Sequence, residues 1–321
     1  MIVITGGAGF IGSTLAKTLI DQELIIIDTF KNIEQRIYLT EIPGVRLVNL
    51  KDCKPILNYF KNDIKYFYHL GANSSTDQTI LSEAVDTNIF WSQFYWDFCT
   101  NNKIPFMYAS SAATYGDGSK GFSDKMTLNE LKDIEINNVY GWSKMYFDIF
   151  VLNQEKIRNT PPIWYGLKFF NVYGANEYHK KKQSSVVHPF LKQLKLTGKI
   201  ELFKSLNKNF LDGEQQRDFV SVNFCIEFMK NIQKQNMKNG LLNVGTGQPK
   251  TFISFANDIM NAFNKKGKIQ FINMPQNLQD HYQYYTKSEN SKTRKVHELM
   301  VDFNYSEDLK LIVKNIVNRI N

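Results

Sequence analysis

Short apolar runs alternate with helix-length segments through the first half of the chain. The runs, which are typical of strands, are 2–5, 24–28, 46–50, 66–70, 106–110 and 164–169. The segments 79–99 and 139–152 are the clearest helices between them. Strands that alternate with helices form βαβ units and assemble into a parallel sheet. The pattern therefore predicts an α/β fold with a doubly wound parallel sheet.

The first apolar run opens directly into a series of glycines. Ile2–Thr5 is followed by Gly6, Gly9 and Gly12, ahead of a helical stretch. In such a turn the first glycine bends the chain, the second lets the backbone approach a pyrophosphate, and the third lets helix and strand pack closely. An acidic residue is expected about 20 residues on to bind the adenosine ribose, and Asp28 ends the second run. The segment predicts a Rossmann-type dinucleotide site with the pyrophosphate at a helix N-terminus.

The alternation of strands and helices loosens after Phe170, where a Lys-rich and polar stretch follows. The later segments 217–220 and 241–247 look like returns to the sheet. We therefore expect two lobes that exchange chain more than once. The expected dinucleotide-binding domain comprises residues 1–171 and 218–246, and a smaller α/β substrate lobe comprises residues 172–217 and 247–321.

The composition is that of an ordinary globular protein of 321 residues with a net charge of +8. Aromatic residues do not interleave with basic residues in one stripe, so nucleic-acid binding is disfavoured, although a positive field helps to capture an anionic nucleotide. No apolar run approaches the length of a membrane span. The first strand begins at Ile2 and leaves no room for a signal peptide before the glycines, so we expect a cytoplasmic protein without a membrane partner.

The cysteines and histidines show no pattern of a metal site. Cys53, Cys99 and Cys225 are widely spaced among apolar or aromatic neighbours, which favours buried free thiols over disulfides or metal ligands. The five histidines form no His-Glu-x-x-His pattern, and no Cys-x-x-Cys pattern occurs. We therefore expect no metal.

Tyr140 and Lys144 are four residues apart in a predicted helix and share one face. The ammonium group can lower the pKa of the phenol and hold the nicotinamide ribose, so that a tyrosinate can act as a base. Tyr178 and Lys182 have the same spacing. Only Tyr140 follows a strand that ends in a hydroxyl-rich segment, in which Ser111 can share a substrate oxygen.

Together these motifs resemble the extended short-chain dehydrogenase/reductase superfamily that acts on nucleotide sugars. Within it, the chain is similar nearly end to end to the family of ADP-L-glycero-D-manno-heptose 6-epimerases. The segments that carry this likeness are 5–12, 110–116, 138–141, 169–174, 217–220 and 282–283. The resemblance implies a homo-oligomer, a pentamer in that family. It would epimerise C6 of ADP-D-glycero-D-manno-heptose, a lipopolysaccharide precursor, by transient oxidation and re-reduction with tightly bound NADP.

Two segments distinguish among reactions of nucleotide sugars. The 4,6-dehydratases carry an Asp-Glu pair just after the hydroxyl residue, where this chain has Ala112 and Ala113. Dehydration is therefore disfavoured. The segment 177–180 resembles the Glu-x-His-Lys segment of the heptose epimerases, which makes Lys180 a second base beside Tyr140. The alternative is that Lys180 is one solvated lysine of the run 180–182.

Carried over residue by residue, the resemblance implies three groups of site residues. The catalytic group is Ser111, Tyr140, Lys144 and Lys180. Around the cofactor would lie Gly6, Gly9, Phe10, Ile11, Gly12, Asp28, Thr29, Lys31, Asn73, Ser74, Asn88, Lys144, Val172 and Lys180. Against the ADP-sugar would lie Ser111, Asn171, His188, Phe203, Arg217 and Tyr282. Arg217 also suits the diphosphate chemically, since a guanidinium binds it bidentately; the alternative is a surface pair with Asp218.

The chain departs from the family pattern in places. The loop between Phe203 and Arg217 is longer, and His188 aligns only with a shift. Asp28 alone suits NAD, whereas Lys31 or Arg36 would be needed near the 2′-phosphate of NADP. We expect NADP, with NAD as the alternative.

Two other functions remain as alternatives. One is an NAD(P)-dependent 4-epimerase for a UDP- or GDP-sugar, which only the segments around Lys180 and Tyr282 distinguish from a heptose epimerase. The other is a non-catalytic NADP-binding regulator. The presence of Ser111, Tyr140 and Lys144 disfavours the regulator.

Overall fold

The computed structural model describes residues 1–31, 36, 39–74, 81–136, 138–235, 237–279 and 282–320. The chain divides into two compact units. The first comprises residues 1–120, 124–169 and 235–243, and the second comprises residues 121–123, 170–234 and 244–321. Residues 121–123, 170–171, 218–234 and 244–246, which were expected in the dinucleotide-binding domain, lie in the second unit.

The first unit is built on a seven-stranded sheet with the order β11-β6-β5-β4-β1-β2-β3. Its strands are β1 (Ile2–Thr5), β2 (Leu24–Asp28), β3 (Arg46–Asn49), β4 (Tyr66–His69), β5 (Phe106–Ser111), β6 (Trp164–Phe169) and β11 (Gly240–Val244). Neighbours from β3 to β6 pair in parallel, as expected for a doubly wound sheet. The strand order reverses between β1 and β4, and in such sheets ligands bind at the carboxyl ends of the strands at this point.

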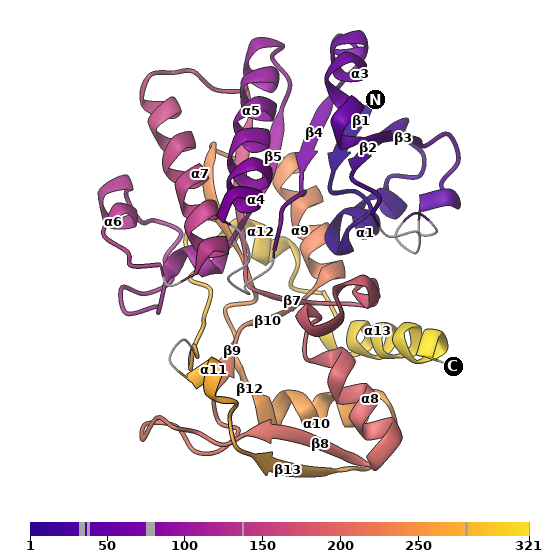
Figure 1. The fold of residues 1–321 in the computed structure, drawn as a ribbon, viewed down its shortest axis with the longest axis vertical. Coiled ribbons are helices and arrows are strands. Elements are labelled where there is room, and N and C mark those ends of the chain that lie inside the picture. The colour runs from indigo at the N-terminus through magenta and orange to yellow at the C-terminus, as the bar shows by residue number, and fades with distance from the viewer. Residues whose placement is uncertain are drawn as a thin grey trace. The chain divides into compact units, whose positions relative to one another are not determined.

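Helices follow these strands along the chain (Figure 1). They are α1 (Phe10–Thr18), α3 (Cys53–Phe60), α4 (Leu81–Val85), α5 (Trp91–Asn101), α6 (Leu128–Lys132) and α7 (Val139–Lys156), with short turns η1 (Leu50–Asp52) and η3 (Ala112–Tyr115). The helix expected at 79–99 is interrupted by a π-helical turn, η2 (Asp86–Phe90); residues 79 and 80 lie outside the described residues. The helix expected at 139–152 is confirmed and extends further, as α7.

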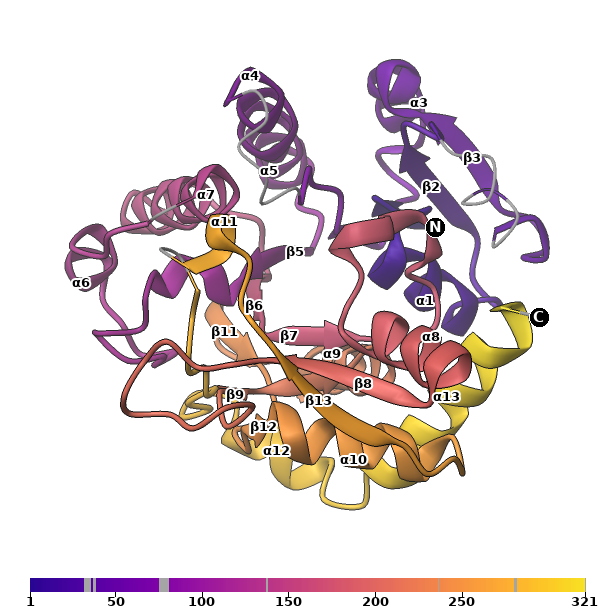
Figure 2. The same ribbon diagram turned by 60° about the horizontal axis from the view of Figure 1, so that its bottom comes forward.

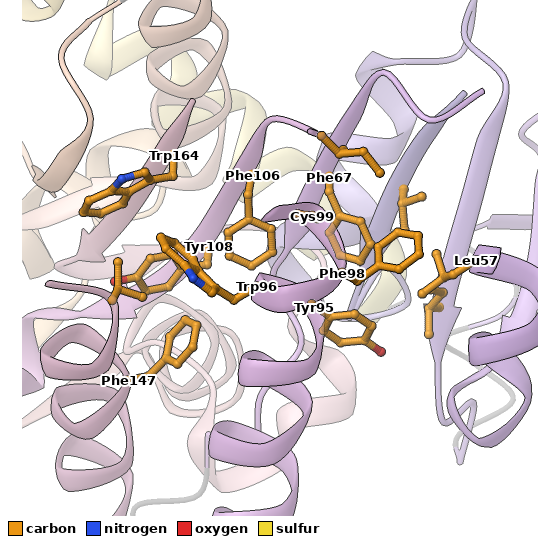
Figure 3. Packing of buried hydrophobic residues seen from close by; sticks show 14 of the residues in the cluster. Leu57, Phe67, Tyr95, Trp96, Phe98, Cys99, Phe106, Tyr108, Phe147 and Trp164 are labelled. Atoms are coloured by element: carbon orange, nitrogen blue, oxygen red, sulfur yellow. The ribbon is translucent and has the colours of Figure 1, made fainter. Parts of the chain in front are cut away.

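Aromatic side chains fill the core of the first unit (Figure 3). The Trp96 ring on α5 lies edge-on to Trp164 of β6 and Phe106 of β5, with centroids 5.5 and 5.9 Å apart. All residues of β6 are buried, as is typical of a strand covered on both faces. Cys53 and Cys99 are buried free thiols in this core, as expected.

The described residues of the second unit form three two-stranded sheets, β10-β7, β12-β9 and β13-β8. Its elements are β7 (Asn171–Tyr173), η4 (Tyr178–Gln183), α8 (Val187–Thr197), β8 (Lys199–Phe203), β9 (Gln216–Arg217), β10 (Phe219–Ser221), α9 (Val222–Gln235), β12 (Lys250–Thr251), α10 (Phe252–Ala262), β13 (Lys268–Ile272), α11 (Gln276–Gln279), α12 (Arg294–Leu299) and α13 (Tyr305–Ile320). Figure 2 shows β8 beside β13, with α8 and α10 near them.

One expected return to the large sheet is confirmed, and the other is wrong. The segment 241–247 contributes β11, which lies beside β6. The segment 217–220 instead forms β9 and β10, and β10 pairs with β7. Because β5 and β11 flank β6 on its two sides, β6 has no edge left to pair with β10.

Helices α8, α10 and α13 share a second core with β8. On α8 the buried residues are Val187, Phe190, Leu191 and Leu194, a spacing that places them on one face of the helix. Among the described residues no helix is long and apolar enough to cross a membrane. The same residues contain no group of three His, Cys, Asp or Glu side chains suited to a metal ion.

Candidate active site

The glycine turn between β1 and α1 has no room for a side chain at Gly6 or at Gly12. A Cβ atom on Gly6 would lie 2.4 Å from the Cα atom of Gly71, and one on Gly12 would lie 2.3 Å from the carbonyl oxygen of Gly6. Gly6 has a φ of +64°, which a side chain disfavours. Helix α1 begins after Gly9 without a side-chain cap, so its N-terminus is suited to an anion. These features fit a dinucleotide pyrophosphate.

Asp28 links the end of β2 to the glycine turn. Its Oδ2 accepts a hydrogen bond from the Ala8 N–H at 3.1 Å, and its Oδ1 accepts one from the Thr29 N–H at 2.7 Å. Burial raises the pKa of this carboxyl, and the hydrogen bonds oppose that change. Thr29 and Lys31 are exposed just beyond the strand, on the segment expected to meet the adenosine ribose.

The end of β5 and the first turn of α7 bring Ser111 and Tyr140 together. The Asn138 side chain caps α7 by accepting a hydrogen bond from the Gly141 N–H at 2.7 Å. The Tyr140 hydroxyl is hydrogen-bonded to Ser111, which favours the phenolate. Burial is the stronger effect and raises the pKa of Tyr140. The structure therefore brings these two side chains together, and the raised pKa favours the neutral phenol.

Lys144 lies one turn further along α7 and is only 4% exposed. Its Nζ donates a hydrogen bond to the Ala109 carbonyl oxygen at 2.8 Å. Burial lowers the pKa of Lys144 to about 8, against the opposing charge of Asp148. The side chain is thus held against β5, on the same helix as Tyr140.

A buried ion pair that was not predicted from the sequence joins α7 to β6. Asp148 Oδ2 is 2.9 Å from the Lys168 Nζ on β6, and both side chains are buried. The hydroxyls of Tyr108 and Ser110 each donate to the Asp148 carboxylate at 2.8 Å. Lys168 also donates to the Thr114 hydroxyl. The i, i+4 spacing of Lys144 and Asp148 was the available sequence signal.

Asn88, expected at the cofactor, lies in η2 and is fully buried. Its Oδ1 accepts from the Asn73 N–H at 2.8 Å, and its Nδ2 donates to the Asn73 carbonyl oxygen at 3.0 Å and to Ser143 Oγ at 2.9 Å. The amide is therefore used within the protein and supports the Asn73 backbone. Asn73 is half-buried and Ser74 is exposed.

In the second unit, Arg217 is a buried cation among aromatic rings. Its guanidinium carbon lies 5.3 Å from the Tyr282 ring centroid and 5.7 Å from that of Phe252. The Phe203 ring is in turn 6.3 Å from Tyr282. Arg217 donates to the carbonyl oxygens of Gln216 and Gln283, and burial lowers its pKa. Three expected substrate residues thus lie together.

The alternative in which Arg217 forms a surface pair with Asp218 is wrong. Arg217 is only 8% exposed, and no carboxylate in the described part of the chain lies within 4.0 Å of it. The buried Asp218 carboxylate accepts hydrogen bonds from the N–H groups of Thr246, Gly247 and Ser288 at 2.8 to 2.9 Å. Asp218 therefore fastens a loop, and the guanidinium of Arg217 retains donors for a ligand.

Lys180 lies in η4 and is half-buried beside a carboxylate. Its Nζ is 3.6 Å from Glu177 Oε2, and the Glu177 side chain is 1% exposed. Burial lowers the pKa of Lys180, and the Glu177 charge opposes this. His188 Nε2 lies 3.8 Å from Glu177 Oε1 and 2.8 Å from the Gly174 carbonyl oxygen. These contacts differ from those of a solvated lysine, and they place His188 beside Glu177.

Tyr178 and Asn171 also form hydrogen bonds within the second unit. Tyr178 donates its hydroxyl to the Ile316 carbonyl oxygen of α13 at 3.1 Å. The side chains of Lys181 and Lys182 lie outside the described part of the structure. Asn171 is exposed on β7 and accepts a hydrogen bond from the Thr286 hydroxyl at 3.1 Å.

The glycine turn, Asp28 and the group Ser111, Tyr140 and Lys144 together define an enzyme of the short-chain dehydrogenase/reductase type with a nicotinamide cofactor. Residues 2–245 match the NAD dependent epimerase/dehydratase family. The chain belongs to this family.

The chain is similar to named epimerases over nearly its whole length. It is 36% identical to ADP-L-glycero-D-manno-heptose-6-epimerase from Fusobacterium nucleatum, over 98% of this chain and 97% of that relative. It is 33% identical to the enzyme of the same name from Nitratidesulfovibrio vulgaris, over 92% and 91%. The crystal structure of the Helicobacter pylori ADP-L-glycero-D-manno-heptose-6-epimerase superposes with a TM-score of 0.76 at 26% identity and covers 99% of this chain and 95% of that one.

Proposed function

We propose that this protein converts ADP-D-glycero-D-manno-heptose to ADP-L-glycero-D-manno-heptose with tightly bound NADP. The likeness to heptose epimerases across 98% of the chain supports the substrate. The observation that carries the reaction type is the hydrogen bond between Ser111 and Tyr140, followed by Ala112 and Ala113 in η3. This site handles a hydroxyl proton but has no acid–base pair after Ser111 for dehydration.

In the proposed reaction the cofactor exchanges the hydride, and side chains orient the sugar and transfer the proton. Bound NADP supplies the acceptor and then the donor of the hydride. Ser111 holds the C6 oxygen of the sugar, and Tyr140 takes the hydroxyl proton from that oxygen. The ammonium of Lys144 favours the phenolate of Tyr140. Reduction on the opposite face of the ketone then gives the other epimer, so net oxidation is zero.

Lys180 is proposed as the second group that handles the proton. An epimerase presents its hydroxyl in two orientations, and one side chain in one place serves only one of them. The half-burial of Lys180 lowers its pKa. A lower pKa increases the fraction of Lys180 that is neutral, and therefore able to act as a base, at the working pH. The buried carboxylate of Glu177 lies 3.6 Å away and limits the motion of the ammonium group.

The second unit is proposed to bind the ADP-sugar. Arg217 supplies a guanidinium with donors suited to diphosphate, and Tyr282 and Phe203 supply flat apolar surfaces. His188 and Asn171 complete the expected substrate group. We propose residues 172–217 and 247–321 as the substrate lobe. Most of the proposed contacts with the ADP-sugar then come from this lobe.

The finer details follow the family resemblance. NADP is proposed because Lys31 and Arg36 lie just beyond Asp28, where a 2′-phosphate would need a cation. Acid release and chromatography of the purified protein test this choice, and recovery of NAD would reject it. We also propose a homo-oligomer, a pentamer, which light scattering tests. The buried free thiols Cys53, Cys99 and Cys225 are compatible with the proposed cytoplasmic location.

Proton NMR of the purified protein with ADP-D-glycero-D-manno-heptose tests the function directly. We expect the C6 epimer to appear without added cofactor. UDP- and GDP-sugars serve as parallel substrates, and turnover of one of these alone would favour a 4-epimerase. Bound NADP with no turnover of any sugar nucleotide would favour the non-catalytic regulator.

A further inference from the structure

A buried histidine lies at the point where the strand order reverses. His69 ends β4 and pairs with Thr5 at the end of β1, directly before the glycine turn. His69 Nδ1 is 2.6 Å from Thr5 Oγ1, and its Nε2 is 2.8 Å from Ser92 Oγ on α5. The three side chains are at most 3% exposed. Both ring nitrogens therefore have a hydroxyl partner away from water.

The neighbouring hydrogen bonds determine which nitrogen of His69 carries the proton. The Ser92 hydroxyl donates to the Asn88 carbonyl oxygen at 2.7 Å, so toward His69 it can only accept. A neutral ring that donates from Nε2 has an acceptor at Nδ1, so the Thr5 hydroxyl donates to Nδ1, while Thr5 Oγ1 accepts from the Gly71 N–H at 3.4 Å. One arrangement satisfies both hydroxyls: Nε2 carries the proton and Nδ1 accepts.

The same chain of hydrogen bonds continues to the catalytic helix. Asn88 Nδ2 donates to Ser143 Oγ at 2.9 Å, and the Ser143 hydroxyl donates to the Tyr140 carbonyl oxygen at 2.8 Å. The Asn88 side chain also bonds to both the N–H and the C=O of the Asn73 backbone. Asn88 lies in the π-helical turn η2, a feature that often occurs at functional sites. The network thus joins Thr5 at one end to Tyr140 at the other through buried groups.

We propose that His69 is a positioning residue whose neutral Nε2–H tautomer holds the glycine turn and the first turn of α7 in place. Through Thr5 it orients the segment that meets the cofactor. Through Ser92 and Asn88 it orients the helical turn that carries Tyr140. The expected effect on turnover rests on the proposed epimerase function, whereas the tautomer and the cofactor retention do not.

The charge state of His69 agrees with this arrangement. Burial, together with the charge of Lys144, holds the pKa of His69 well below its usual range. A protonated ring would present two donors to two hydroxyls, and one hydroxyl hydrogen would then lose its acceptor. A single neutral form therefore persists through the working pH range.

Nitrogen-15 NMR of histidine-labelled protein tests the tautomer without any substrate. The resonances of His69 are assigned by comparison with His69→Phe. We expect a pyrrole-type Nε2 and a pyridine-type Nδ1 that do not titrate between about pH 5.5 and 8.5, a window from about one unit below to about two units above the ordinary histidine pKa of about 6.5. An Nδ1–H tautomer, or titration near pH 6.5 as in an ordinary histidine, would overturn the proposal.

Two conservative variants separate the two branches of the network. His69→Gln places an amide donor near the Nε2 position and keeps the Ser92 branch, whereas His69→Asn places an acceptor near Nδ1 and keeps the Thr5 branch. We expect His69→Phe to lower kcat about 10- to 100-fold through misplacement and to release bound cofactor faster, with the KM for ADP-sugar unchanged. His69→Gln should restore kcat, and His69→Asn should restore only cofactor retention.

Tyr165→Phe is the matched control, because Tyr165 is a buried residue that donates its hydroxyl to the Met237 carbonyl oxygen at 2.8 Å. It should lose stability to a similar degree in urea without a change in kcat or cofactor retention. If His69→Gln and His69→Asn have equal kcat and retain bound cofactor equally, the positioning role is rejected and His69 only contributes to packing. If wild-type protein turns over no sugar nucleotide, the proposed function fails, while tautomer and retention still decide the role of His69.

Discussion

The two units differ in how they satisfy buried charge. In the first unit, Asp148 and Lys168 form a buried ion pair that is completed by the hydroxyls of Tyr108 and Ser110. In the second unit, Arg217 is also buried, but its partners are carbonyl oxygens and aromatic rings. Burying a charge without an opposite charge is costly. The Asp148–Lys168 pair is neutralised within the protein and holds α7 against β6. Arg217 has no such counter-charge among the described residues and is suited to bind an anion.

The two lysines proposed to act near the substrate show a similar difference. Lys144 donates to a backbone carbonyl and is nearly inaccessible, so its position is set by the sheet. Lys180 is half-buried in a short helical turn, with the Glu177 carboxylate 3.6 Å from its Nζ, so it is less enclosed than Lys144. This difference is expected if Lys144 only orients and polarises while Lys180 exchanges protons.

The largest expected effect comes from removing either proposed base. Tyr140→Phe and Lys180→Met should each lower net epimerisation by about 10²–10⁴-fold, the usual contribution of a general acid or base. Each change removes proton transfer for one of the two orientations of the C6 hydroxyl, and every catalytic cycle needs both. Proton NMR of the C6 epimers measures the rate, and deuterated cofactor can reveal slow label exchange within one epimer.

Lys310→Met is the control for lost positive charge, because Lys310 lies on α13 and pairs with Glu307 at the surface. Its rate should equal that of the wild type. Wild-type turnover in Lys180→Met together with inactive Tyr140→Phe would rule out the two-base mechanism.

The next largest effect should come from breaking the internal pair of the first unit. Asp148→Asn leaves Lys168 as a buried cation without a counter-charge and should lower the free energy of unfolding by about 3–5 kcal/mol. Urea denaturation measures this loss. In the double variant Asp148→Asn/Lys168→Met part of the stability should return, because the two residues interact directly.

Arg294 offers a comparison for this prediction, since its ion pair with Glu298 is exposed on α12. Arg294→Ala should change stability by less than about 1 kcal/mol. A similar loss in Asp148→Asn and Arg294→Ala would contradict the idea that burial gives the Asp148 pair its importance.

A smaller effect, and on binding, is expected for the cation of the second unit. Arg217→Ala should weaken ADP-sugar binding by about 2–3 kcal/mol, seen as a higher KM with little change in kcat, since the ground and transition states share the diphosphate contact. Steady-state kinetics measure both constants. Arg217→Lys should recover part of the loss, because an ammonium keeps the charge but not the planar fork. An unchanged KM would remove Arg217 from the substrate site.

The smallest effect is a pH dependence that reports on Lys144. Its pKa of about 8 predicts an alkaline limb at which the rate is about half-maximal near that pH, because the ammonium that favours the Tyr140 phenolate is lost. In the free protein the folded pKa lies below the ordinary value of 10.5. The unfolded state therefore binds more protons between these values, and stability rises with pH there. Lys144→Met should remove that slope in denaturation curves.

The sequence by itself determined the elements and the local chemistry. The apolar runs located β1 to β6 to within a residue or so at their ends, since burial on both faces of a parallel sheet demands continuous apolar strands. The glycine spacing, Asp28, and the Tyr140 and Lys144 spacing follow from backbone geometry that is local in the chain. These features sufficed to indicate a dinucleotide-binding oxidation–reduction enzyme, and the family likeness then narrowed it to an epimerase.

Only the tertiary structure decided the contacts between distant segments. It assigned 217–220 to small sheets because β11 covers the edge of β6, and it enclosed Arg217 while turning Asp218 to the amides of Thr246 and Gly247. No periodic pattern of the sequence indicates either result, because each depends on contacts between segments that are far apart in the chain. His69, Asp148 and Lys168 gained their partners in the same way: directional hydrogen bonds between buried groups form only after the elements have packed.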